Sequence, residues 1–111
     1  MPYDERLAER IRGLLAGEAG VTEQRMFGGL AFLIGGNMAV AASGQGGLLV
    51  RVDPDQSDEL RATTSARPME MRGRQMAGWL LVDLASVQDE AALARWVALG
   101  RTYAASLPAK R

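Results

Sequence analysis

Short apolar segments joined by tight turns, between Val21 and Val52, constrain the fold more than any other feature of the chain. The breaks are Gly28-Gly29, Gly35-Gly36-Asn37 and the polar run from Ser43 to Gly47. Connections this short join antiparallel strands, because a parallel pair needs a crossover of a dozen or more residues. We expect three antiparallel strands here, with Gly28-Gly29 as a bend or bulge in the first.

Three helices are predicted around these strands. Apolar residues recur at helical spacing from Asp4 to Ala16. Asp53 and Pro54 have the side chains of an N-cap and a first helical position, so a short helix should begin there. The segment Ser86 to Asp89 resembles a capping box and predicts the start of the last helix. The apolar stripe of that helix consists of Leu93, Val97, Gly100, Ala104 and Leu107.

Two further strands, Pro68 to Met71 and Trp79 to Val82, flank a segment from Arg72 to Gly78 that should turn the chain. The order of elements is then α-βββ-α-ββ-α. This order predicts an α+β fold, a two-layer α/β sandwich whose five-stranded antiparallel sheet has helices mainly on one face. With 111 residues, the chain should form a single domain over residues 1–111, with a tail from about residue 108.

The absence of two residue types excludes several kinds of chemistry. The sequence has no Cys and no His, and its one lysine is Lys110. Disulfides, zinc sites of the Cys/His kind, thiolate nucleophiles and Ser-His-Asp triads are therefore excluded. An enzyme would need a carboxylate pair or an oxygen-ligated magnesium ion. The acidic run from Asp53 to Glu59 lacks the spacing of a calcium loop. We expect a non-enzymatic protein with no catalytic residues, no metal and no cofactor.

The net charge and the N-terminal residues indicate which partners and which cellular location to expect. Thirteen basic and thirteen acidic side chains cancel, whereas a surface that neutralises phosphates carries a basic excess. Direct nucleic-acid binding is therefore not expected. Asp4 and Glu5 stand where a signal peptide would be basic, and glycines break the uncharged stretch from Met26 to Val50. We expect a cytoplasmic protein that makes no membrane contact.

Two clusters of residues admit a functional interpretation. Arg67, Arg72 and Arg74 lie close together in sequence around Gly73 and are a candidate site for an anion or a partner, since guanidinium groups bind phosphate or carboxylate in bidentate fashion. The alternative is a solvated loop whose arginines pair with nearby carboxylates. The methionines near the strands, Met26, Met38, Met69, Met71 and Met76, are either an adaptable contact surface or core filling beside Phe27 and Trp79.

The strands also carry an unusual second face. Bulky residues occupy alternate positions, and the opposite positions hold small or apolar residues where a one-sided sheet would be polar. We predict that this second face, or an edge strand beside it, is a homodimer or partner interface. The alternatives are that helices cover both faces, or that exposed alanines carry no meaning. The candidate interface residues are Ala31, Leu33, Ala39, Ala41 and Leu49.

Four short blocks, Met26 to Phe32, Gly36 to Met38, Ala66 to Met69 and Gly73 to Trp79, resemble the N-terminal domain of TfoX/Sxy proteins. The resemblance extends from Tyr3 to about Leu107. It implies a bacterial protein with a fold like that of type III secretion chaperones. It also implies a link to the regulation of natural competence, in which full-length members act with a transcription activator. We expect a stand-alone copy without the C-terminal domain of those regulators.

The sequence thus favours a regulatory protein-interaction domain, homodimeric and in contact with a protein partner such as a transcription regulator. A small anion- or ligand-binding module built on Arg67, Arg72 and Arg74 is the alternative function. A flat apolar face would favour the first, and a pocket lined by the three arginines would favour the second.

Overall fold

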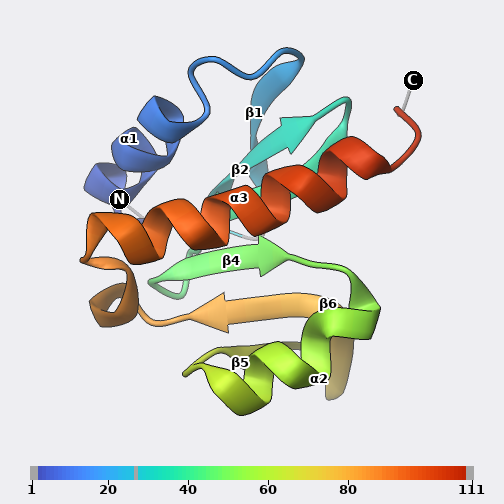
Figure 1. Ribbon diagram of the computed structural model, residues 1–111. Helices are drawn as coiled ribbons and strands as arrows, with labels where there is room; N and C mark the ends of the chain where they lie inside the picture. Colours follow the sequence, from blue (N-terminus) through green and yellow to red (C-terminus); the bar gives the residue numbers. More distant parts are fainter. Residues whose placement is uncertain (1–2, 27, 110–111) are drawn as a thin grey trace.

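The computed structural model describes residues 3–26 and 28–109. Phe27, Lys110 and Arg111, which the sequence analysis placed in the methionine cluster and the tail, lie outside the described residues. The elements follow one another along the chain as in Figure 1: α1 (Glu5–Leu14), β1 (Val21–Met26), β2 (Gly29–Ile34), β3 (Asn37–Ala42), β4 (Leu48–Arg51), α2 (Pro54–Thr63), β5 (Arg67–Met71), β6 (Arg74–Val82), the 3₁₀ turn η1 (Leu84–Val87) and α3 (Glu90–Ser106).

The strands form one antiparallel sheet with the order β1-β2-β3-β4-β6-β5. The predicted α+β class is confirmed, and the sheet has six strands rather than the five expected. The extra strand arises at Gly28-Gly29, where the chain reverses so that Met26 pairs with Gly29. Gly28 has φ +77, and a Cβ on Gly29 would lie 2.2 Å from the carbonyl oxygen of Ala42. Only glycine fits both conditions, so the segment turns where the sequence indicated a bend or bulge.

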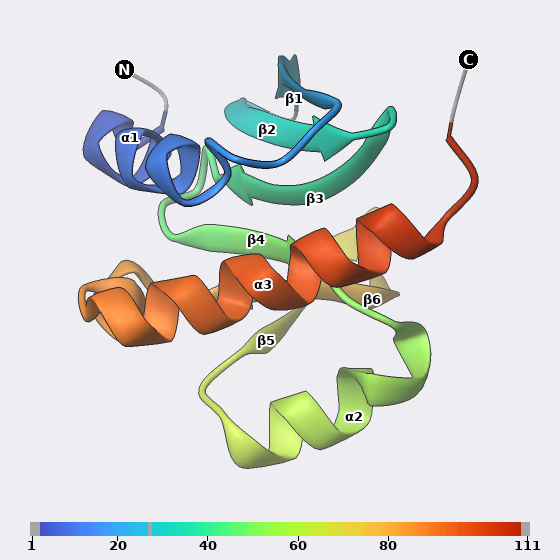
Figure 2. The ribbon, with the colours of Figure 1, turned by 45° about the horizontal axis from the view of Figure 1, so that its top comes forward.

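All three α-helices of the described chain lie on one face of the sheet (Figures 1 and 2). Leu7 and Ile11 of α1 and Leu93 and Val97 of α3 are buried there, and Leu60 of α2 packs against the same core. The facing strand residues include Phe32 and Val50 from the predicted bulky positions. Val40 and Leu80 lie in the same core. None of the helices in the described ranges is long and apolar enough to cross a membrane.

In α3 the predicted apolar stripe is confirmed, but the predicted start of the helix is wrong. Leu93, Trp96, Val97, Gly100 and Ala104 are buried, while Leu107 is only half-buried at the C-cap. The N-cap is Asp89, whose carboxylate accepts a hydrogen bond from the backbone N–H of Ala92 at 3.0 Å. Ser86, the predicted cap, belongs to η1. A charged carboxylate directly before Glu90 is the stronger acceptor for the free N–H groups, so the helix begins three residues later.

The β5–β6 hairpin also departs from the prediction. Its turn is only Arg72-Gly73, both residues in the left-handed region with φ 53 and 77, and β6 begins at Arg74. The register jumps from Pro68–Leu80 to Met69–Met76, so that Ala77, Gly78 and Trp79 have no partner in β5. Gly78, with φ 83, makes this bend possible. As a result, β5 is a short edge strand interrupted by a proline and by an irregularity.

Candidate functional site

The face of the sheet opposite the helices, called here the helix-free face, carries a second apolar cluster. Its buried members come from β2, β3, β4 and β5: Ala31, Leu33, Met38, Ala41, Leu49 and Met69. Larger side chains from β1 and β6 pack around them and stay partly exposed: Met26, Met76, Trp79 and Leu81. No helix of the described ranges covers this face (Figure 2).

Four of the five predicted interface residues lie on the helix-free face, and Ala39 does not. Ala31, Leu33, Ala41 and Leu49 belong to its cluster, whereas Ala39 packs with Ile34 and with Ala104 of α3. The cause is a bulge in the β2–β3 pair. Phe32 pairs with Val40 and Leu33 pairs with Met38, which leaves Ala39 as an extra residue. An extra residue breaks the two-residue alternation, so assigning Ala39 to the second face was wrong.

The chain itself shields the small residues of this face from water. Ala31, Leu49 and Ala41 have exposed fractions of 0%, 4% and 5%. The bend at Gly78 brings Met69 and Met76 of the hairpin into their cluster, and Met26 joins from β1. These small residues therefore do not themselves form an uncovered patch. A partner would instead meet the four partly exposed side chains around them.

The described methionines divide between buried and partly exposed positions. Met38 and Met69 are buried, while Met26 and Met76 are half-buried at the margin of the helix-free face. A cavity of about 30 Å³ remains between Met26, Met38 and Met69. The side chain of Met71 lies outside the described residues. Unbranched thioether side chains next to a small void can repack easily, which suits an adaptable contact surface.

Trp79 is held in place by a cation. It lies on β6 directly opposite Arg51 of β4, and the Arg51 guanidinium carbon is 5.1 Å from the Trp79 ring centroid. The same carbon is 5.5 Å from the ring of Tyr103 on α3. Attraction between the cation and the two rings fixes the indole, although its face toward solvent remains partly open. Trp79 is therefore a preorganised side chain of the helix-free face rather than a member of the main core.

The structure does not bring the three candidate arginines together. Arg67 begins β5 and its guanidinium lies 3.1 Å from a carboxylate oxygen of Asp83, whereas Arg72 and Arg74 stand at the hairpin turn. Arg67 and Arg72 are five positions apart along the strand, a distance of roughly 16 Å at about 3.3 Å per residue. All three side chains are exposed. Among the described residues, the three arginines thus line no common pocket.

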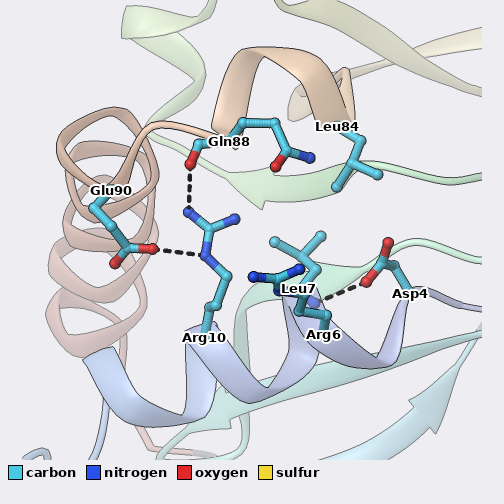
Figure 3. A pocket seen from close by; sticks show the side chains of 7 residues that line it. All are labelled: Asp4, Arg6, Leu7, Arg10, Leu84, Gln88 and Glu90. Atoms are coloured by element: carbon cyan, nitrogen blue, oxygen red, sulfur yellow. Dashed lines mark hydrogen bonds and ion pairs between the residues drawn. The ribbon is translucent and has the colours of Figure 1, made fainter.

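A cavity that the sequence analysis missed lies where α1 meets η1 and the start of α3 (Figure 3). It measures about 230 Å³, and its lining is Asp4, Arg6, Leu7, Arg10, Leu84, Gln88 and Glu90. Arg10 donates to Oε1 of Glu90 at 2.7 Å and to the carbonyl oxygen of Gln88 at 3.1 Å. These contacts join residues about 80 positions apart, so no local sequence signal could have shown the cavity. Because Arg10 is already paired with Glu90, an incoming anion would have to displace a carboxylate.

A two-fold hydrogen-bonded ion pair joins strand β1 to α1. Arg12 of α1 forms two hydrogen bonds with Glu23, 2.6 Å from Nε to Oε2 and 2.8 Å from Nη2 to Oε1. Arg12 also contacts Glu9. The hydrogen bonding by Arg12 holds the pKa of the Glu23 carboxyl below its ordinary value, despite some desolvation. Glu23 is therefore firmly ionised, on a strand whose residues 22 to 25 are all exposed.

Comparison with known protein families shows which family the chain belongs to. The sequence model of the TfoX N-terminal domain matches residues 13–104. The chain belongs to the TfoX N-terminal domain family. Neither the curated proteins nor the solved structures include a significant match to it. The likeness to secretion chaperones therefore stays a prediction.

The blocks that carry the TfoX resemblance meet on one surface. Met26 and Ala31 come from the first block, Met38 from the second and Met69 from the third, while the fourth contributes Met76 and Trp79. All six side chains belong to the cluster of the helix-free face or pack against it. Segments that are far apart in sequence thus build a single surface.

Proposed function

We propose that this chain is a non-enzymatic regulatory domain that acts by binding another protein through its helix-free face. The observation that carries the proposal is the convergence of all four family-related blocks on that face. Its partly exposed side chains suit protein recognition. Trp and Met are enriched at interfaces, and a tryptophan fixed by Arg51 loses little conformational freedom on binding.

The partner is proposed to be a protein of the transcription machinery, in line with the role of the TfoX family in competence. Any effect on DNA is then indirect, because basic and acidic side chains balance. A cytoplasmic location is part of the same proposal. The anion-binding alternative is not favoured, because Arg67 lies at the opposite end of the hairpin from Arg72 and Arg74.

Complementation in the cells of origin tests this function. The gene is deleted, and the strain receives either the wild-type gene or a variant of the helix-free face, Leu81→Lys or Trp79→Ala. Leu14→Lys is the matched control, because Leu14 is a large apolar residue exposed to 40% on α1, away from that face. Circular dichroism first establishes that each variant is folded.

We expect the wild-type gene and Leu14→Lys to restore the transcript levels that the deletion changes, and the two face variants to fail. Failure of folded variants would place the activity on the helix-free face. Full complementation by both face variants would contradict the proposed surface. A deletion that leaves every transcript unchanged would contradict the regulatory role itself.

A further inference from the structure

The two edges of the sheet differ in how open they are to another strand. β1 pairs with β2 over six consecutive residues without any register shift, and it contains no proline. Four of its six residues, Thr22 to Arg25, are exposed. The other edge, β5, contains Pro68 and a register shift. A regular edge strand presents unpaired N–H and C=O groups and is a template for strand addition, whereas a proline and an irregularity block it.

The hydrogen-bond pattern shows which groups of β1 point outward. Gly35 donates its N–H to the carbonyl of Gly20 at 3.2 Å, immediately before the strand. Hydrogen-bonded and non-hydrogen-bonded pairs alternate along an antiparallel ladder. Thr22, Gln24 and Met26 therefore direct their backbone groups toward β2. Val21, Glu23 and Arg25 direct theirs to the open edge.

This alternation permits few registers for a symmetric pair of β1 strands. Residues opposite each other must have backbone groups of the same orientation, both outward or both inward, so a symmetric pair is centred on a residue: Glu23, Gln24 or Arg25. A pair centred on Glu23 would place two carboxylates opposite each other, and a pair centred on Arg25 would place two guanidinium groups opposite each other. Like charges at such positions are destabilising. Centring on Gln24 instead places Glu23 of each copy opposite Arg25 of the other.

We infer that two copies of this chain associate through antiparallel pairing of their β1 strands, with Gln24 on the two-fold axis and Glu23 opposite Arg25 of the second copy. Glu23 is already ionised and oriented by Arg12, and its oxygens retain capacity for a further donor. The two sheets become one, and the two helix-free faces lie side by side. This inference is independent of the proposed function, since it rests on the edge of the sheet and not on its face.

Substitutions that reverse the charge of Glu23 or Arg25 provide the decisive test. Glu23→Lys places two cations opposite each other in the inferred register, and Arg25→Glu places two anions there. Each variant alone should dissociate at least about tenfold more readily than the wild type in sedimentation equilibrium. An equimolar mixture should form a heterodimer, because every position then faces an opposite charge. The double variant Glu23→Lys/Arg25→Glu should dimerise like the wild type.

Hydrogen exchange on the wild-type protein gives a second readout that needs no substitution. The amides of Glu23 and Arg25 should exchange more slowly as protein concentration rises, while the amide of Gln24, already bonded to β2, should not change. A wild-type chain that stays monomeric at millimolar concentration would overturn the inference. So would a dimer whose dissociation is the same in both single variants, because it would use another surface.

Discussion

Replacing Gly100 by alanine should destabilise the protein, although alanine is the better helix former. Gly100 lies in the middle of α3, where the helix crosses β3. A Cβ at this position would be 2.4 Å from the carbonyl oxygen of Ala39 and 2.9 Å from Cγ1 of Val40. The nearer obstacle is backbone of a central strand and cannot rotate away. Helix α3 would have to retreat by about 1 Å to reach ordinary contact distance.

The magnitude follows from two opposing terms. Overpacking of this kind costs about 1–3 kcal/mol, and the upper end applies because retreat of α3 also loosens Leu93 and Val97. The higher helix propensity of alanine returns about 1 kcal/mol. We therefore expect the free energy of unfolding to fall by about 2 kcal/mol and the Tm by roughly 10 °C.

The same substitution at Gly13 is the matched control. Gly13 lies in α1, and a Cβ there would meet nothing within 4 Å. Gly13→Ala should therefore stabilise the protein by about 0.5–1 kcal/mol. Urea unfolding followed by tryptophan fluorescence measures both variants. Equal or greater stability of Gly100→Ala relative to the wild type would refute the argument that α3 approaches β3 as closely as described.

Three further predictions concern single side chains. Asp89→Ala should lower the free energy of unfolding by about 1 kcal/mol, because it removes the cap of α3, whereas Ser86→Ala should change it much less. Arg12 lowers the pKa of Glu23 in the folded protein. The ionised carboxyl therefore stabilises the fold at pH values above the ordinary pKa of Glu, and this contribution is lost as the pH falls through the lowered pKa of the folded state. The stability difference between wild type and Glu23→Gln should thus shrink toward acid pH in urea titrations. Ala41→Glu should unfold the monomer, seen by circular dichroism, since position 41 is only 5% exposed.

Features set by neighbouring residues were predictable from the sequence. Asp53 caps α2 as predicted. Asp4, predicted as the first residue of the first helix, is its N-cap. The stripe of α3 was also visible, because the helical period alone determines it. The start of α3 was not, since Ser86 and Asp89 are both acceptable caps. The structure uses Asp89, whose carboxylate accepts from the N–H of Ala92, while Ser86 lies in η1.

Features that depend on distant contacts could not be predicted. The bulge that turns Ala39 toward α3 has no local signature, because an extra residue in β3 shows only against the register of β2. The shielding of the small residues likewise depends on the bend at Gly78, which brings Met69 and Met76 from far along the chain. Alternation therefore placed four of the five candidate residues on the correct face, but it showed neither the bulge at Ala39 nor that the chain covers the other four.

The proline in β5 limits how far the sheet can grow. An assembly with two open edges per molecule propagates into fibres, whereas one with a single open edge closes after the first contact. Because Pro68 and the register shift interrupt β5, pairing through β1 leaves no second regular edge for another molecule. Pro68 thus acts as a stop on polymerisation. If copies pair through β1, a regular β5 would give each copy a second open edge and would allow filaments to form.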